Sequence, residues 1–533
     1  YTKILRLSLR HKGSIIIVAL SIFGLSLLTA STIRKEFLPA EDQSQFLVRI
    51  KTPRGSSLET TSKTFRIIED WLNSRPEISG TFAIIGGLTG GQVNTGLIFT
   101  NMKPKGKRGE DPTLKHEISQ GEFMALTRKR LNSIPGVRPV VQDLSARGFS
   151  SSRGFPIEFT IQGPNWQQLV KETNRITDDL KKTGTVTDVD MDYEGETPEI
   201  AIIPDRSAAE RQGIPISSIA DTISTAISGL RIAKYTSEGR RYDVRVKEID
   251  PPNSSELSPT ERLEKLYVRN NRGQIVPILG AVKVEERLAP INLTRLNRQR
   301  AITVFANVAA GQSQQKVLER VLQFGKTHLS PGYSIQLSGT AQTFQESFQS
   351  LLFAIVLGLA VAYMILATQF NSFTDPVTVM MALPFSLTGA FFALLLTHQS
   401  LNLYSMIGLI LLMGIAKKNS ILLIDFTNQV RDESKTSIQE SLIKACPVRL
   451  RPILMTSIAQ VVGALPAALA FGPGAESRKP MAIVVIGGVI LSTALTLLVI
   501  PCVYSFLTPK ERKHSDVDRI LREEQSLSTK ASG

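Results

Sequence analysis

The chain has 533 residues, with 62 Lys and Arg against 47 Asp and Glu, and its formal net charge is +15 at pH 7. Hydrophobic residues make up 42% of it and charged residues 20%, which excludes a disordered or collagen-like chain. Its two cysteines, Cys446 and Cys502, exclude a disulfide-stapled framework.

The hydrophobic residues are concentrated in six blocks, which predict six membrane-spanning helices. These blocks are Ser14–Ile33, Leu351–Ala367, Pro376–Thr397, Leu403–Thr427, Pro452–Phe471 and Met481–Thr508. Each approaches or exceeds the ~20 residues that cross ~30 Å of hydrocarbon. The first block is too long for a signal-peptide core, so we expect a retained span. The chain opens at Tyr1 without an initiator methionine, and we expect a fragment or a processed piece.

The distribution of Lys and Arg predicts the orientation of these spans. An even number of spans places residues 1–13, 428–451 and 509–533 on one side, and these segments hold 15 Lys and Arg. The two short loops opposite hold only two. Because basic residues are retained in the cytoplasm, we expect both termini there and residues 34–350 outside.

The external region begins with a β-α-β-β-α-β pattern. Alternating hydrophobicity and capping residues predict strand Gln45–Lys51, helix Ser56–Asn73, strands Ile78–Ile85 and Thr95–Lys103, helix Ser119–Ser133 and strand Val137–Asp143. This is the element order of the ferredoxin-like split β-α-β unit.

The same order then recurs with an interruption. Its first half is predicted at Phe155–Gln162, Asn165–Lys182 and Thr185–Tyr193, and its second half at Gln299–Ala309, Gln312–Leu329 and Tyr333–Gly339. The insertion between them, roughly Thr197–Thr294, contains a hairpin signal at Leu266–Leu279 around Asn271-Arg272-Gly273. We therefore expect an internal duplication with one inserted segment.

The motifs of common enzymes are missing from the sequence. Gly325-Lys326-Thr327 lacks the preceding glycine of a phosphate loop, because Arg320 occupies that position. The five histidines have no metal-ligand spacing: His11, His116, His328, His398 and His514. Basic charge without interleaved aromatic residues gives no platform for nucleic acid. We expect neither an enzyme, a cofactor nor a metal site.

Two lysines lie in the middle of the fourth span. Lys417 and Lys418 are ~14 Å from its cytoplasmic end at 1.5 Å per residue. An unpaired lysine there costs several kcal/mol and indicates a functional site, unless its amine reaches the headgroups. Asp425 shares a face with Lys418 but lies two turns (~10.5 Å) away, and no other acid lies inside the predicted spans. We expect the carboxylate partner of Lys418 outside this chain.

The fifth span begins with two arginines and a proline. Pro452 suits the first turn of a helix. Arg449 and Arg451 fit either a functional role or anchoring at the cytoplasmic boundary. Thr456 lies seven residues after Arg449 on the same face, and its hydroxyl fits either a functional role or a bond within its own helix.

These spans resemble the C-terminal half of RND (resistance–nodulation–division) multidrug efflux pumps. The resemblance rests on the sequence motifs GIAKKNSILLIDF (414–426) and RLRPILMTS (449–457). It is supported by QFNSFTDP (369–376), ALPFSLTGA (382–390) and FPIEFTIQG (155–163). The resemblance covers residues 1 to about 508. It implies an α-helical polytopic membrane protein with six transmembrane helices and an α+β periplasmic region of duplicated ferredoxin-like βαββαβ subdomains.

The resemblance also implies roles for single residues. In the family, the lysine of this motif contacts two aspartates on a span of the N-terminal half, and that role falls on Lys418, which precedes Asn419. An arginine and a threonine of the same proton relay correspond to Arg449 and Thr456. Asn419 and Asp425 complete the candidate relay.

Family substrate pockets use phenylalanines beside a Gly-rich loop. Phe82 and Phe99 match such positions, although either also fits the core of a sheet. The matching loop, 86–92, has less aromatic character than in the best-known members, and its candidate residues are Gly86, Gly87, Leu88, Thr89, Gly90 and Gly91.

The implied domains are a cytoplasmic N-terminus with the first span (1–33), two porter subdomains (37–148, and 149–196 with 295–350), an inserted docking subdomain (197–294), five spans (351–508) and a cytoplasmic tail (509–533). The implied partners are the N-terminal half of the transporter, a homotrimer, a periplasmic adaptor, an outer-membrane channel, amphiphilic substrates and membrane lipid.

We therefore expect half of a proton-driven drug exporter of the bacterial inner membrane. Export of metal ions or lipids is the nearest alternative, although residues 34–350 contain only three dispersed methionines, Met102, Met124 and Met191. An assembly or sensor subunit that does not transport is an alternative of another class.

Overall fold

The computed structural model describes residues 1–86, 92–109, 115–144, 153–193, 195–227, 229–247, 259–290, 292–434, 436–472 and 474–508. They form two compact units, one of Tyr193–Leu293 and one of the remaining chain. The tail that we expected in the cytoplasm, 509–533, lies outside the described residues.

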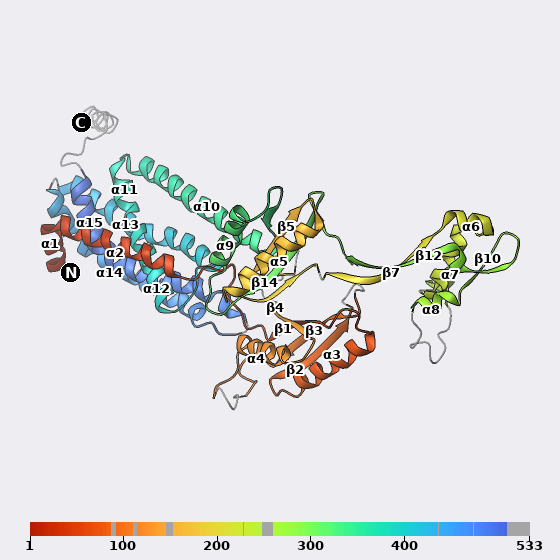
Figure 1. Cartoon of the computed structure of the whole chain (residues 1–533). Helices are drawn as coiled ribbons and strands as arrows, with labels where there is room; N and C mark the ends of the chain where they lie inside the picture. The colour runs from red at the N-terminus through yellow and green to blue at the C-terminus, as the bar shows by residue number, and fades with distance from the viewer. Residues whose placement is uncertain are drawn as a thin grey trace. The chain divides into compact units, whose positions relative to one another are not determined.

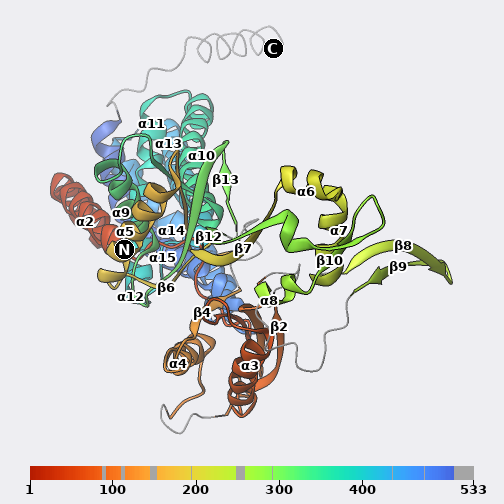
Figure 2. The ribbon, with the colours of Figure 1, turned by 45° about the vertical axis from the view of Figure 1, so that its right-hand side comes forward.

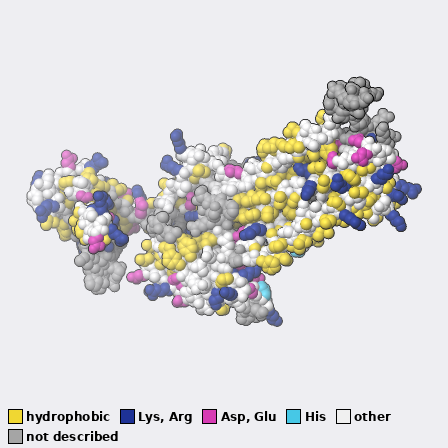
Figure 3. Space-filling view, turned by 180° about the vertical axis from the view of Figure 1, so that it is seen from behind, with side chains coloured by type: hydrophobic (Ala, Val, Ile, Leu, Met, Phe, Trp, Pro, Cys, Tyr) yellow, Lys and Arg dark blue, Asp and Glu magenta, His cyan; other side chains and the backbone are white. Residues whose placement is uncertain are grey.

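Six helices of the described chain are long and apolar enough to cross a membrane. They are α2 (Lys12–Thr32), α10 (Gly339–Phe370), α11 with α12 (Thr374–Met380 and Ala382–Leu396), α13 (Leu403–Ser434), α14 (Ile438–Ala468) and η4 with α15 (Ala475–Ser477 and Lys479–Leu507). A short helix, α1 (Thr2–Arg10), precedes them. Hydrophobic side chains cover most of this bundle along its length, and Lys and Arg gather at one end (Figure 3).

Helix α15 packs against α12, α13 and α14 at the centre of the bundle (Figure 1). Glycines permit this close approach, because a Cβ on Gly389 of α12 would overlap the backbone carbonyl of Gly487. A Cβ on Gly488 would likewise overlap the side chain of Leu412 on α13. The helices are therefore held by close backbone packing as well as by apolar side chains.

The prediction that Pro452 lies in the first turn of a helix is wrong. Helix α14 begins at Ile438, capped by the Ser437 side chain, and passes through both Pro447 and Pro452. A proline removes one backbone hydrogen bond, and a long helix supported by neighbours tolerates that loss. Hydrophobicity marks the apolar part of such a helix, whereas capping marks its true start.

The first sheet domain is four-stranded and antiparallel, with strand order β2-β3-β1-β4. Its elements follow the predicted β-α-β-β-α-β order: β1 (Gln45–Lys51), α3 (Leu58–Asn73), β2 (Ile78–Ile85), β3 (Thr95–Met102), α4 (Gln120–Asn132) and β4 (Arg138–Asp143). Both helices cover the same face of the sheet (Figure 1). Phe65 and Phe123 bring them onto a core that includes Val48 and Ile98.

The second domain repeats this element order around the insertion. It contains β5 (Ile157–Gly163), α5 (Trp166–Lys182), β6 (Val186–Met191), β13 (Arg295–Leu296), β14 (Gln299–Val308), α9 (Gln314–Thr327) and β15 (Ser334–Leu337). The sheet order is β13-β14-β5-β15, and β6 also pairs with β14. Strand β6, which precedes the insertion, therefore lies beside β14, which follows it.

The unit Tyr193–Leu293 has its own small core around Ile219 and Ile278. It contains β7 (Glu196–Pro204), α6 (Arg206–Gln212), α7 (Ile216–Ile227), β8 (Leu230–Ser237), β9 (Arg240–Val246), α8 (Pro259–Glu264), β10 (Tyr267–Arg269), β11 (Ile275–Pro277), η3 (Ile278–Ala281) and β12 (Val282–Pro290). The pairing of β10 with β11 confirms the predicted hairpin. Strands β8 and β9 form a second, exposed hairpin (Figure 2).

Candidate functional site

The charged candidates of α13 lie on its exposed side, and their polar neighbour lies inside. Lys418 and Asp425 are exposed, Lys417 is half-buried and Asn419 is buried. The Asp425 carboxylate accepts a hydrogen bond from the Gln429 side chain at 2.9 Å. Lys418 makes no ion pair within the described part of the chain. The structure thus leaves the Lys418 ammonium on an uncovered face of the helix.

The candidates on α14 have partners other than Lys418. The Arg449 guanidinium lies over the ring of Phe426 on α13, 4.3 Å from its centroid, which is cation–π distance. The Thr456 hydroxyl donates to the Ile453 carbonyl oxygen of its own helix at 3.1 Å. The sequence left two possibilities for Thr456, a functional role or a hydrogen bond within its own helix, and this contact is the hydrogen bond within the helix.

Two residues absent from the sequence prediction connect α13, α14 and α15. The Asn419 side-chain amide donates to Ser457 Oγ at 3.3 Å, and Ser457 Oγ lies 2.8 Å from Thr493 Oγ1. Because the amide supplies the proton of the first bond, the Ser457 hydroxyl is free to donate to Thr493. Ser457 adjoins Thr456 in the matched string, but its link to Thr493 depends on the helix packing.

A buried acid, Asp375, lies immediately before the third predicted span. It is in the first turn of α11 and is 3% exposed. It accepts from Asn428 of α13 at 3.3 Å, and Asn428 accepts from the Tyr504 hydroxyl at 2.6 Å. Asn428 is ten residues, or ~15 Å, along α13 from Lys418. Asp375 is therefore not the missing partner of Lys418.

The two candidate phenylalanines form a pair on the sheet face opposite α3 and α4. Phe82 on β2 is directly opposite Phe99 on β3, and their ring centroids are 6.3 Å apart. Phe82 is 60% exposed and Phe99 is half-buried, so the sheet-core alternative is wrong for Phe82. Strand alternation explains this, because neighbouring Ala83 and Ile98 belong to the core beneath the helices.

Of the predicted Gly-rich loop 86–92, only Gly86 and Gln92 lie among the described residues. Gly86 has a φ of +79°, a region that favours glycine, and its N–H donates to the Thr95 carbonyl oxygen at 2.7 Å. Gly87, Leu88, Thr89, Gly90 and Gly91 lie outside the described residues.

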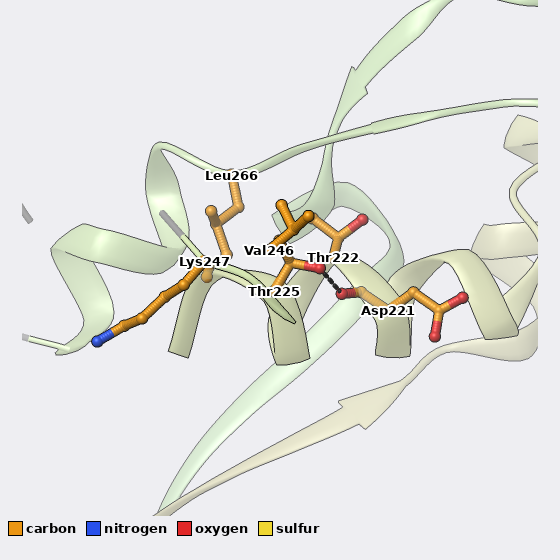
Figure 4. Close-up of a pocket in the computed structure, with 7 residues that line it drawn as sticks. Asp221, Thr222, Thr225, Val246, Lys247 and Leu266 are labelled. Carbon is orange, nitrogen blue, oxygen red and sulfur yellow. Dashed lines mark hydrogen bonds between the residues drawn. The ribbon is translucent and has the colours of Figure 1, made fainter. Parts of the chain in front are cut away.

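A small cavity of about 430 Å³ lies in the unit Tyr193–Leu293 and contains none of the candidates (Figure 4). In Figure 4 the Asp221 carboxylate and the Lys247 amine extend in opposite directions. The Thr225 hydroxyl is bonded to the Asp221 backbone carbonyl within α7. No group of three or more His, Cys, Asp and Glu that could hold a metal ion is present among the described residues.

A buried ion pair fixes the segment between α2 and the first sheet. Arg108 bonds both carboxylate oxygens of Asp42, at 2.6 and 2.5 Å. Burial raises the pKa of Asp42, but the hydrogen bonds from Arg108 and from backbone amides outweigh it and hold the pKa below its ordinary value. In the same loop, Lys105 bonds Glu476 of η4 at 3.1 Å, which ties the sheet domain to the turn before α15.

Comparison with known proteins places these features in one family. A sequence model of the AcrB/AcrD/AcrF family matches residues 1–508. "Multidrug resistance protein MdtC" of Escherichia coli (strain UTI89 / UPEC) is 29% identical over 512 residues, which is 95% of this chain and 48% of the relative. The protein of the same name from Edwardsiella ictaluri (strain 93-146) is 29% identical over 513 residues, with the same coverage.

Solved structures show the same fold. Two crystal forms of a heavy metal efflux pump superpose with TM-scores of 0.83 and 0.79, at 23% and 24% identity, over 95% of this chain. The chain spans about half the length of these relatives and solved structures.

Proposed function

The chain belongs to the AcrB/AcrD/AcrF family of RND transporters, and from this premise we propose that it forms one half of a proton-driven exporter in the bacterial inner membrane. The observation that carries the proposal is the exposed lysine, Lys418, in the middle of the candidate span α13. A charged amine there requires a carboxylate or water, because hydrocarbon offers it neither. The chemistry is that of a transporter rather than an enzyme.

The proposed relay depends on carboxylates from the other half of the transporter. Ionised carboxylates would attract the Lys418 ammonium, and protonation would remove that attraction. The resulting change in helix position would couple proton movement to transport. Asn419, through its bond to Ser457, would pass a displacement of α13 to α14. Arg449 and Thr456 of α14, with Asp425 of α13, would belong to the same relay. Proton-motive force would take the place of a cofactor.

The proposed substrates are small amphiphilic compounds, which would bind beside Phe82 and Phe99. Their paired rings offer an exposed aromatic surface next to Gly86, where the Gly-rich loop begins. Aromatic faces bind apolar parts of a ligand without demanding one shape, which suits a broad substrate range. The two sheet domains would be ferredoxin-like porter subdomains in the periplasm.

The proposed assembly is a homotrimer that works with a periplasmic adaptor and an outer-membrane channel. The unit Tyr193–Leu293 would be the docking subdomain, and its compact separate core is consistent with an independent role in assembly. Membrane lipid would surround the hydrophobic surface of the bundle (Figure 3).

The test is a Lys418→Ala variant of the complete transporter, expressed in a bacterium that lacks its other exporters. We expect loss of drug resistance at an unchanged protein level, whereas the neighbouring Lys417→Ala retains resistance. Equal resistance of Lys418→Ala and the unsubstituted transporter would refute the relay.

Heavy-metal export is the second candidate, because the solved structures of this fold come from a heavy metal efflux pump. Heavy-metal export would be favoured if, in the same strain, the transporter gave resistance to copper or silver salts that depends on Lys418 and gave no resistance to amphiphilic drugs.

A further inference from the structure

Helices α13 and α15 run in the same direction and keep a constant register. The Leu412 side chain of α13 lies against Gly488 of α15, and Asn428 bonds Tyr504 at 2.6 Å. From the first contact to the second, the chain advances by 16 residues on each helix, which is about 24 Å at 1.5 Å per residue. Residues midway between them, eight residues from each contact, must therefore lie at the same depth.

The two midpoints are both hydroxyl residues, Ser420 and Thr496. Each is 0% exposed, and neither Ser420 Oγ nor Thr496 Oγ1 has a hydrogen-bond partner among the described residues. A buried hydroxyl without a partner costs about 1–3 kcal/mol, so nearly all such groups in native proteins are bonded to protein or to water. Two at one depth, on helices in contact, require a common explanation.

The same depth already carries hydrogen-bonded polar groups. Asn419 adjoins Ser420, and Thr493 precedes Thr496 by one turn. Ser457 of α14 bonds both Asn419 and Thr493. All five side chains are at most 5% exposed, so they form a buried polar layer across α13, α14 and α15.

Toward the Asn428–Tyr504 bond, the core becomes apolar again, with Leu423, Ile424, Leu497 and Ile500 buried. The polar layer is therefore enclosed on that side. Buried water in proteins typically bonds such otherwise unpartnered polar groups, whereas apolar cavities stay dry.

We propose that Ser420 and Thr496 bind an internal water molecule that completes the polar layer. The water would accept from one hydroxyl and donate to the other, and it retains a further donor and acceptor for backbone groups. Such a water gives the layer an exchangeable partner when α13 shifts against α15. This last consequence rests on the proposed function, whereas the water site itself does not.

The test compares Thr496→Val with Thr427→Val in the complete transporter in detergent. Thr427 is also buried on this bundle, but its hydroxyl donates to the Leu423 carbonyl oxygen of its own helix at 2.7 Å. If Thr496 holds water, Thr496→Val lowers the midpoint of thermal unfolding by about 1 °C more than Thr427→Val does, because the shift per kcal/mol is small in so long a protein. If the Thr496 hydroxyl is dry, the valine removes an unsatisfied group, and the midpoint rises, which would overturn the proposal.

Two further measurements guard against a merely structural effect. Combining Ser420→Ala with Thr496→Val is expected to lower the midpoint by less than the two single shifts together, because the first substitution already releases the shared water. Additive shifts would overturn the sharing. Thr496→Ser, which keeps the hydroxyl, is expected to keep the midpoint of the unsubstituted transporter and to show density for water within ~3 Å of both hydroxyls at high resolution. Absence of that density would also overturn the site.

Transport distinguishes the site from the proposed function. We expect Thr496→Val to slow export at least fivefold while Thr496→Ser and Thr427→Val remain within twofold of the unsubstituted transporter. Unchanged export by Thr496→Val would overturn the role in helix movement. If Lys418→Ala exports normally, the proposed function fails, but the thermal shifts still decide the water site.

Discussion

Replacing Arg108 by methionine is expected to release the segment that joins α2 to the first sheet. The Arg108 side chain is fully buried and Asp42 is 10% exposed. Besides both Asp42 oxygens, the guanidinium reaches the Lys103 carbonyl at 2.7 Å, the Ile118 carbonyl at 3.1 Å and Ser44 Oγ at 2.8 Å. Methionine fills a similar volume but offers no donor, so all five contacts disappear while the packing is largely retained.

The magnitude follows from the charge left behind. Asp42 keeps the amide donors of Gln120 and Ser44, at 3.0 and 3.2 Å, but loses the one cationic partner that it has among the described residues. Removing one partner of a buried ion pair costs about 3–5 kcal/mol. Since 1.4 kcal/mol is a factor of ten, local opening becomes about one hundredfold to a few thousandfold more frequent.

Amide hydrogen exchange of the intact protein in detergent measures this opening, read at the Gln120 amide that bonds Asp42. The matched control is Arg320→Met, because Arg320 pairs with Asp179 at 3.2 Å with both side chains exposed. Exposed pairs contribute at most ~1 kcal/mol, so the control changes exchange less than about fivefold. Equal effects of the two variants would refute the reasoning.

The same ion pair predicts a pH dependence with a definite sign. The folded-state pKa of Asp42 is depressed, so its contribution is fully present above the unfolded value of about 3.9 and is lost as pH falls through the folded value. The difference between the unsubstituted protein and Arg108→Met should be constant from about pH 5 to 7 and shrink below about pH 4. A difference that grows on acidification would contradict this assignment.

Two further substitutions test the packing, each read by thermal unfolding in detergent. Gly389→Ala forces a Cβ against the Gly487 carbonyl and should cost about 1–3 kcal/mol, whereas Gly414→Ala meets no atom within 4 Å and should cost nothing. Phe82→Ala should cost less than about 1 kcal/mol because Phe82 is 60% exposed, whereas Phe65→Ala, from a side chain 2% exposed, should cost about 3–5 kcal/mol. Equal losses within either pair would contradict the packing described.

Local signals in the sequence determined most of the architecture. Side-chain caps fixed helix starts closely, because Ser119 and Asn165 both accept the backbone N–H three residues on, as their positions before apolar patterns indicate. Apolar length identified the long helices, and the hairpin around Asn271 followed from turn residues alone. These features depend on neighbouring residues, which a sequence displays directly.

Contacts between segments that are distant in the chain could not be predicted from the sequence. Helix α14 begins at Ile438, and its continuation through Pro452 has no clear signal in the sequence, because support from other helices decides whether a proline ends a helix. The burial of Asp375 has no signal in the sequence either, because its bond to Asn428 joins residues 53 positions apart.

The sequence alone identifies Lys418 and its need for a carboxylate partner, since the cost of a charge in hydrocarbon requires no structure. The tertiary structure was needed to show that Phe82 is exposed and that Asn419 reaches Thr493 through Ser457. It also decided that Ser420 and Thr496 lie at one depth, because register between two helices is set by their packing and not by either helix alone.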